Sequence, residues 1–184
     1  MNKSVLIIIS SIVVLMMLSG CATSTNPNAD GSPYWTTSNP KNTRALHFEV
    51  GSAKQSTPQL SLLRATSSAK DAIGRWASTT VDNAVVTFVE EAGESLRNQQ
   101  TLEVLQNLSV QTVSIALRGV SVAERYTAPD GTVWVLSSYP VKNLKDAYKQ
   151  QTLELEKKLK KAEAKAELMM EYLDRQLEKD VVVE

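Results

Sequence analysis

The chain has 184 residues, and its 20 lysines and arginines balance its 20 aspartates and glutamates. A balanced charge predicts no strong attraction to nucleic acid or to acidic lipid. One cysteine and one histidine exclude a disulfide within the chain and nearly exclude a zinc site made of these residues. We therefore expect one domain with appendages and no nucleic acid among its partners.

The first twenty residues have the pattern of an export signal. Lys3 gives a short positive region, and an apolar run interrupted only by two serines extends from Val5 to Leu18. A run of 14 residues is shorter than the roughly 20 that a membrane-spanning helix needs. It has the proportions of a signal-peptide core, so residues 1–20 are predicted to be a lipoprotein signal peptide.

The predicted signal ends in a leucine and two small residues before a cysteine: Leu18, Ser19, Gly20 and Cys21. This order resembles the lipobox of bacterial lipoproteins, in which the cysteine sulfur takes up diacylglycerol and the small residues admit the signal peptidase. We expect cleavage before Cys21 and attachment to the membrane through lipid on its sulfur. The alternative is an uncleaved membrane anchor in which Cys21 is incidental.

The segment 21–44 is predicted to be the lipidated cysteine and a flexible tether, because Ser, Thr, Asn, Pro and Gly dominate it. Ala22 stands where an aspartate commonly retains lipoproteins of Gram-negative bacteria in the inner membrane, so it favours the outer membrane. Tyr34 and Trp35 are exceptions in this polar segment. They could dock on the folded domain, lie among lipid headgroups or bind a ligand.

A strand and a long helix are predicted to begin the folded domain. Residues 45–50 alternate before Gly51, with Leu46, Phe48 and Val50 on one face and His47 and Glu49 on the other. A hydroxyl cap and a first-turn proline follow in Ser56, Thr57 and Pro58. Apolar residues then recur at spacings of three and four: Leu62, Ala65, Ala69, Ala72, Ile73, Trp76, Ala77, Val81, Ala84, Val85 and Phe88. The alanines would let a sheet approach closely. The β-branched run at 85–89 also suits a strand, but the helical spacing continues through it, so we expect helix.

A second helix and a β-hairpin complete the predicted domain. The apolar side of the helix carries Leu102, Leu105, Val113, Ala116 and Leu117, and Arg118 and Gly119 suit its end. Residues 120–126 alternate, 128–131 form a turn containing Pro, Asp and Gly, and 132–136 return as a strand that Pro140 ends. The order strand, helix, helix, strand, strand predicts an α+β fold over residues 45–140, with a small antiparallel sheet packed on the long helix.

Several motifs occur in a fixed order along this region. They are Pro33-Tyr34-Trp35, Gly51-Ser52-Ala53, the alanine-rich helix, Leu117-Arg118-Gly119-Val120 and Pro129-Asp130-Gly131-Thr132-Val133-Trp134-Val135-Leu136. The set resembles the LPP-twenty family, small membrane-associated bacterial lipoproteins, over residues 33–140. The resemblance implies a variant of the dodecin fold and an envelope role, some relatives being linked to flagellar structures in the outer membrane. It implies no catalytic residue. The chain departs from the family in its charged C-terminal extension and at Ser137 and Ser138, where apolar residues are usual.

Residues 141–184 are predicted to form a long charged C-terminal helix, because residues 143–179 contain no Gly or Pro and are rich in helix formers. Apolar residues recur at alternating spacings of four and three, a coiled-coil-like seam: Leu155, Leu159, Ala162, Ala166, Met169 and Leu173. The seam could bind other envelope proteins or a second copy of the chain. Alternatively, the helix could project alone or pack back on the domain.

The sequence offers little for catalysis. His47 lies opposite the apolar face of its strand, so we expect it to be exposed or at an edge. We find no nucleophile elbow, no phosphate-binding glycine loop and no metal-ligand spacing. Trp76 and Trp134 lie within periodic elements and are expected in the core. We therefore expect no catalytic residue, no metal, no cofactor and no enzyme activity.

Two functions follow as hypotheses. The first is a lipid-anchored envelope lipoprotein with a structural, assembly or protein-interaction role, in an outer-membrane or flagellum-associated complex. The second is a periplasmic module that binds a small ligand or cell-wall glycan in a groove between the sheet and the helix. An envelope enzyme would have to depend on His47 or on a carboxylate cluster.

Overall fold

The computed structural model describes residues 27–91, 99–159 and 166–182. The chain divides into two compact units, residues 1–34 and residues 35–184, and each is described by itself. The predicted signal peptide, with the lipobox and Cys21, lies outside the described residues.

The described part of the first unit is a tight turn. The N–H of Gly31, which has a φ of +80°, donates to the carbonyl of Asn28 over 2.8 Å. The Asp30 carboxylate accepts hydrogen bonds from the hydroxyl and the N–H of Ser32, and these bonds lower the pKa of Asp30. Part of the predicted tether therefore has local structure.

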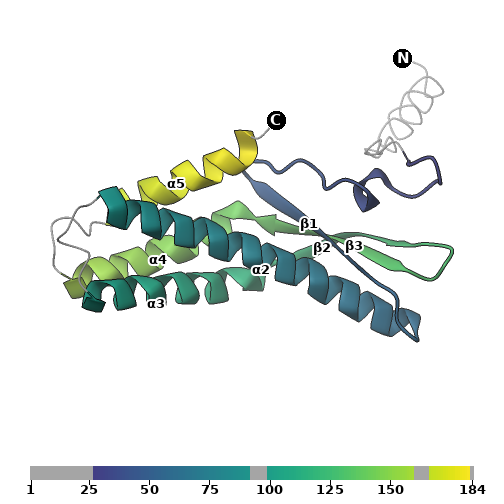
Figure 1. Cartoon of the computed structure of the whole chain (residues 1–184), viewed down its shortest axis with the longest axis horizontal. Coiled ribbons are helices and arrows are strands. Elements are labelled where there is room, and N and C mark those ends of the chain that lie inside the picture. Colours follow the sequence, from purple (N-terminus) through teal and green to yellow (C-terminus); the bar gives the residue numbers. More distant parts are fainter. Residues whose placement is uncertain (1–26, 92–98, 160–165, 183–184) are drawn as a thin grey trace, which may run out of the picture. The chain divides into compact units, whose positions relative to one another are not determined.

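The second unit contains a three-stranded antiparallel sheet packed on one long helix (Figure 1). The strands β1 (Leu46–Ala53), β2 (Ser121–Thr127) and β3 (Val133–Pro140) lie in the order β1-β3-β2. Helix α2 (Pro58–Glu91) packs against β1 and β3. The predicted α+β class and the predicted order of elements are confirmed.

Helix α2 begins and continues as its sequence predicts. The hydroxyl of Thr57 accepts a hydrogen bond from the N–H of Leu60 over 3.2 Å, which satisfies a free donor of the first turn. The β-branched run at 85–89 is helical, and α2 continues beyond it to Glu91. Burial of its face explains this, since Val85 and Phe88 lie in the core.

The hairpin is also confirmed. Gly131 has a φ of +87°, and its N–H donates to the carbonyl of Ala128 over 2.9 Å. The carboxylate of Asp130 accepts from the N–H and the hydroxyl of Thr132, which lowers the pKa of Asp130. The strand β3 ends at Pro140, as expected.

His47 was expected to be exposed or at an edge, but it lies on the face of β1 that packs on α2. His47 is only 3% exposed, whereas Leu46 is exposed and Phe48 and Val50 are half-buried. The reason lies at Gly51 on the same face as His47, where a Cβ atom would lie 2.1 Å from the carbonyl oxygen of Ala65. The backbones of β1 and α2 touch here because both positions lack large side chains, so this face is the one that is buried.

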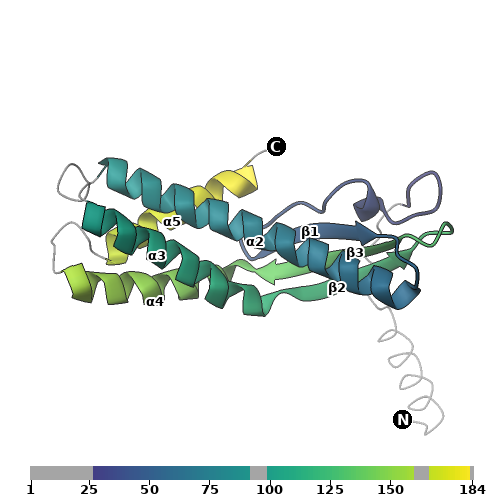
Figure 2. The ribbon, with the colours of Figure 1, turned by 60° about the horizontal axis from the view of Figure 1, so that its bottom comes forward.

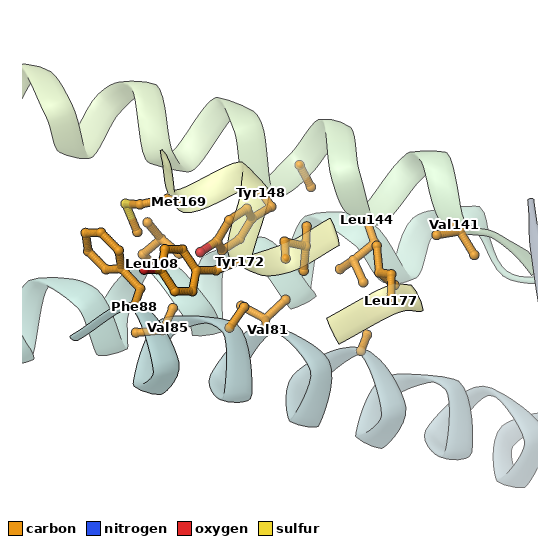
Figure 3. Close-up of a cluster of buried hydrophobic side chains, with 14 of the residues drawn as sticks. Val81, Val85, Phe88, Leu108, Val141, Leu144, Tyr148, Met169, Tyr172 and Leu177 are labelled. Atoms are coloured by element: carbon orange, nitrogen blue, oxygen red, sulfur yellow. The ribbon is translucent and has the colours of Figure 1, made fainter. Parts of the chain in front are cut away.

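Four helices build the larger part of the core, beyond the sheet (Figure 2). Helix α3 (Gln99–Ala116) continues as a short 3-10 turn, η3 (Leu117–Gly119). Helices α4 (Val141–Leu159) and α5 (Ala166–Val182) pack on α3 and α2 respectively. Figure 3 shows the apolar side chains that they share: Val81, Val85, Phe88, Leu108, Val141, Leu144, Tyr148, Met169, Tyr172 and Leu177.

The C-terminal segment therefore contains two helices where the sequence predicted one. They pack against each other as well as on the domain. Four residues of the predicted seam are buried within the chain itself: Leu155, Ala166, Met169 and Leu173. Of the other two seam positions, Ala162 lies outside the described residues and the burial of Leu159 is not described. The alternative in which this segment packs back on the domain is the one observed.

Candidate functional site

The segment 35–45, here called the strap, docks on the sheet. Trp35 is 1% exposed, and its Nε1 donates to the carboxylate of Glu124 in β2 over 2.7 Å. At the opposite edge of the sheet, the side-chain oxygen of Asn42 accepts a hydrogen bond from the N–H of Phe48 in β1 over 2.8 Å. Docking is thus the observed alternative for Trp35, and the folded part begins before residue 45.

The strap shortens the predicted tether. Because Trp35 is fixed to the domain, residues 22–34 remain between Cys21 and the domain, which is 13 residues. A fully extended chain of this length spans at most roughly 45 Å.

Trp134, which was expected in the core, is half-buried, and Trp76, also expected there, is only partly buried.

Replacing Trp35 by alanine is expected to release the strap. Truncating a buried tryptophan typically costs about 3–5 kcal/mol, and Glu124 would lose its partner, so we expect a fall of about 3 kcal/mol in the free energy of unfolding. Tyr34→Ala is the matched control, because Tyr34 is 49% exposed and its loss should cost less than about 0.5 kcal/mol. Equal effects of the two substitutions in urea unfolding would contradict the docking.

A pocket of about 110 Å³ lies where the strap, β1, α2, α4 and α5 meet. Its lining residues come from segments that are far apart in the sequence: Asn42, Thr43, Arg44, His47, Trp76, Val141, Lys145, Asp174, Leu177, Glu178, Asp180 and Val181. Aromatic and aliphatic side chains therefore line it together with side chains of both charges. We take this pocket as the candidate site.

A stacked pair of rings forms one wall of the pocket. The rings of His47 and Trp76 are parallel within 12°, with centroids 3.8 Å apart, and Tyr139 meets Trp76 edge-on. The Nε1 of Trp76 donates to the carboxylate of Asp180 over 2.8 Å, so this ring pair is tied to the end of α5.

His47 itself is incompletely paired. Its Nε2 lies 3.1 Å from the carboxylate of Glu49, so Nε2 is the nitrogen that carries a proton. Its Nδ1 is buried and has no hydrogen-bond partner among the described residues. An unpaired buried polar atom typically costs about 1–3 kcal/mol. Among the lining residues, Asp174 also has a buried oxygen, Oδ1, that accepts no hydrogen bond among the described residues, although it lies 2.7 Å from the ammonium group of Lys145.

The charges of the pocket are partly free. Lys145 and Asp174 form an ion pair of 2.7 Å across α4 and α5. Among the described residues, Arg44 and Glu178 make no ion pair, and both are exposed at the pocket. One cation and one anion of the lining are therefore available to a ligand.

No catalytic triad is formed around His47. Ser137 lies on the same face of the sheet, directly across from Glu49. However, its hydroxyl is buried without a partner among the described residues, so it makes no hydrogen bond to His47. Within the described ranges, no group of three or more histidine, cysteine, aspartate or glutamate side chains could hold a metal ion.

No protein family model matches the chain, and no curated protein matches it. Within the described residues, which begin at 27, no helix is long and apolar enough to cross a membrane.

The sequence suggested a groove between sheet and helix, but at Gly51 the sheet lies in close contact with Ala65 and Ala69 of α2, which leaves no space for a ligand at this point. The pocket lies at the end of the sheet instead. Sequence reasoning missed Arg44, Lys145 and Glu178 as site residues, because they come from three separate segments and carry no local motif.

Proposed function

We propose that the protein is a lipid-anchored envelope lipoprotein with a structural, assembly or protein-interaction role, held on the outer membrane of a Gram-negative bacterium. The observation that carries the proposal is the leucine, serine, glycine and cysteine order that ends the apolar run at Cys21. The resemblance to the LPP-twenty family adds support, and it favours an outer-membrane or flagellum-associated complex.

The docked strap supports a role close to the membrane. With Trp35 fixed to Glu124, only the segment 22–34 separates the lipidated cysteine from the folded domain. A short link keeps the domain beside the bilayer and raises its effective concentration for partners in the same membrane.

The C-terminal helices are the proposed contact with other envelope proteins or with a second copy. Most of their apolar seam faces the core, but Leu153 of α4 is 41% exposed and Leu168 of α5 is 36% exposed. Glu154 and Lys157, which form an ion pair of 2.8 Å, are close to Leu153 in the sequence of α4. Exposed apolar residues with polar neighbours are usual in protein interfaces.

A photo-crosslinking residue at Leu153 tests this contact in intact cells. We expect it to link the chain to an envelope protein or to a second copy. The same residue at Lys70, which is exposed on α2, is the control and should give fewer products. Absence of any product from Leu153, with normal protein level, would contradict an interaction through the C-terminal helices.

A second candidate function is the binding of a small ligand. The observation that favours it is the pocket with the ring wall of His47 and Trp76 and the free charges of Arg44 and Glu178. Ligand sites commonly combine an apolar wall with a few polar groups. This function does not exclude the first, since a tethered domain can bind both a ligand and a partner.

A further inference from the structure

The charges of the pocket match the two ends of an amino acid. Arg44 can receive a carboxylate as a bidentate partner, and Glu178 can receive an ammonium group. Both are exposed and make no ion pair among the described residues. Lys145 and Asp180 stand beside them with the same pair of signs, although each already has a partner.

The rest of the lining suits a short apolar side chain. Trp76, Leu177 and Val181 give an apolar wall, and Val141 closes the side towards α4. The volume of about 110 Å³ is somewhat smaller than the roughly 150 Å³ cavity that holds a benzene molecule. A ligand of a few heavy atoms, with its charged groups near the mouth, fits this space.

His47 adds an observation that is independent of the charges. Its side chain lines the pocket, and its Nδ1 is buried without a hydrogen-bond partner among the described residues. Because Nε2 is engaged with Glu49, Nδ1 accepts a hydrogen bond when the ring is neutral. Nδ1 has almost no accessible surface, so a ligand in the pocket would contact the ring of His47 and not this nitrogen.

We propose that the pocket binds a zwitterion of amino-acid size with a short apolar side chain, its carboxylate at Arg44 and its ammonium group at Glu178. The inference rests on the second candidate function, ligand binding, and does not depend on the lipid at Cys21.

Calorimetric titration of the full-length chain in detergent micelles with L-valine tests the proposal. Isobutylamine and 3-methylbutanoate keep the carbon skeleton next to one charge each, and we expect each to bind at least about tenfold more weakly than valine. A valine-valine dipeptide distinguishes the source: tighter binding than valine identifies a peptide, and weaker binding identifies a free amino acid.

Two exposed substitutions assign the ends of the ligand. Arg44→Ala should weaken the binding of valine and 3-methylbutanoate by about tenfold and leave that of isobutylamine unchanged. Glu178→Gln should weaken the binding of valine and isobutylamine and leave that of 3-methylbutanoate unchanged. Arg118→Ala and Glu167→Gln are matched controls, because both residues are exposed and lie outside the pocket.

Several outcomes would overturn the inference. Isobutylamine binding as tightly as valine would make the pocket a site for cations, and the second candidate function, ligand binding, would still hold. No saturable heat for any of the four probes up to about 10 mM would remove ligand binding as well, while the crosslinking result at Leu153 would still decide the first function.

Discussion

Gly51→Ala is expected to be among the most destabilising single substitutions in the domain. The new Cβ atom would lie 2.1 Å from the carbonyl oxygen of Ala65 and 2.5 Å from the N of Ala69, and both are backbone atoms that no rotamer change can move. The strand would have to move away from α2. We expect a loss of about 3 kcal/mol or more, at the upper end of the usual cost of overpacking.

Gly74→Ala is the matched control, because Gly74 lies in α2 and a Cβ atom there would meet no backbone atom of another element. A Cβ atom there would meet only the methyl groups of Leu117 at 3.5 Å, which is an ordinary contact. Alanine is the better helix former, so this substitution should stabilise by about 0.5–1 kcal/mol. Urea unfolding followed by circular dichroism measures both. Similar midpoints for Gly51→Ala and the parent chain would contradict the close contact of β1 with α2.

Cys21→Ser is expected to abolish the incorporation of fatty acid and to remove the chain from the outer-membrane fraction. A serine hydroxyl is a far weaker nucleophile than a cysteine thiolate at neutral pH, so no thioether to diacylglycerol forms. Without acyl chains, the gain of about 0.8 kcal/mol for each buried CH₂ is lost. Labelling with radioactive palmitate and fractionation of the membranes measure both effects.

Ala22→Asp separates lipid attachment from sorting. The cysteine is unchanged in this variant, so the label should be retained, while the protein should move to the inner membrane. Full labelling of the Cys21→Ser variant would refute lipid attachment at this position. An unchanged location of Ala22→Asp would refute only the sorting argument.

The elements of the fold were predictable where local chemistry decides them. The hydroxyl of Thr57 and the ring of Pro58 mark the start of α2, and Gly131 marks the hairpin. The helical spacing also correctly outweighed the β-branched run at 85–89. In each case one continuous segment contains all the determining residues.

The buried face of β1 was not predictable from alternation. The pattern shows that Leu46 and His47 lie on opposite faces, but both faces of this sheet are covered, one by α2 and the other in part by the strap. Contact with α2 is decided by Gly51, which permits the closest approach of the backbones. The burial of His47 follows from that contact and not from its own polarity.

The pocket could not be predicted from the sequence, because it depends on how distant segments of the chain pack together. A continuous run of helix formers does not reveal that α4 and α5 are separate helices that pack on each other. Only that packing brings Glu178 and Arg44 to the same pocket. The strap has the composition of a linker, and only its residue Trp35 indicated from the sequence that it could dock on the folded domain.

The most direct test of membrane attachment is the mass of the N-terminal peptide of the protein isolated from cell membranes. The account predicts a peptide that begins at Cys21 and carries diacylglycerol on the sulfur. A peptide that still contains residues 1–20, or a Cys21 with a free thiol, would contradict it.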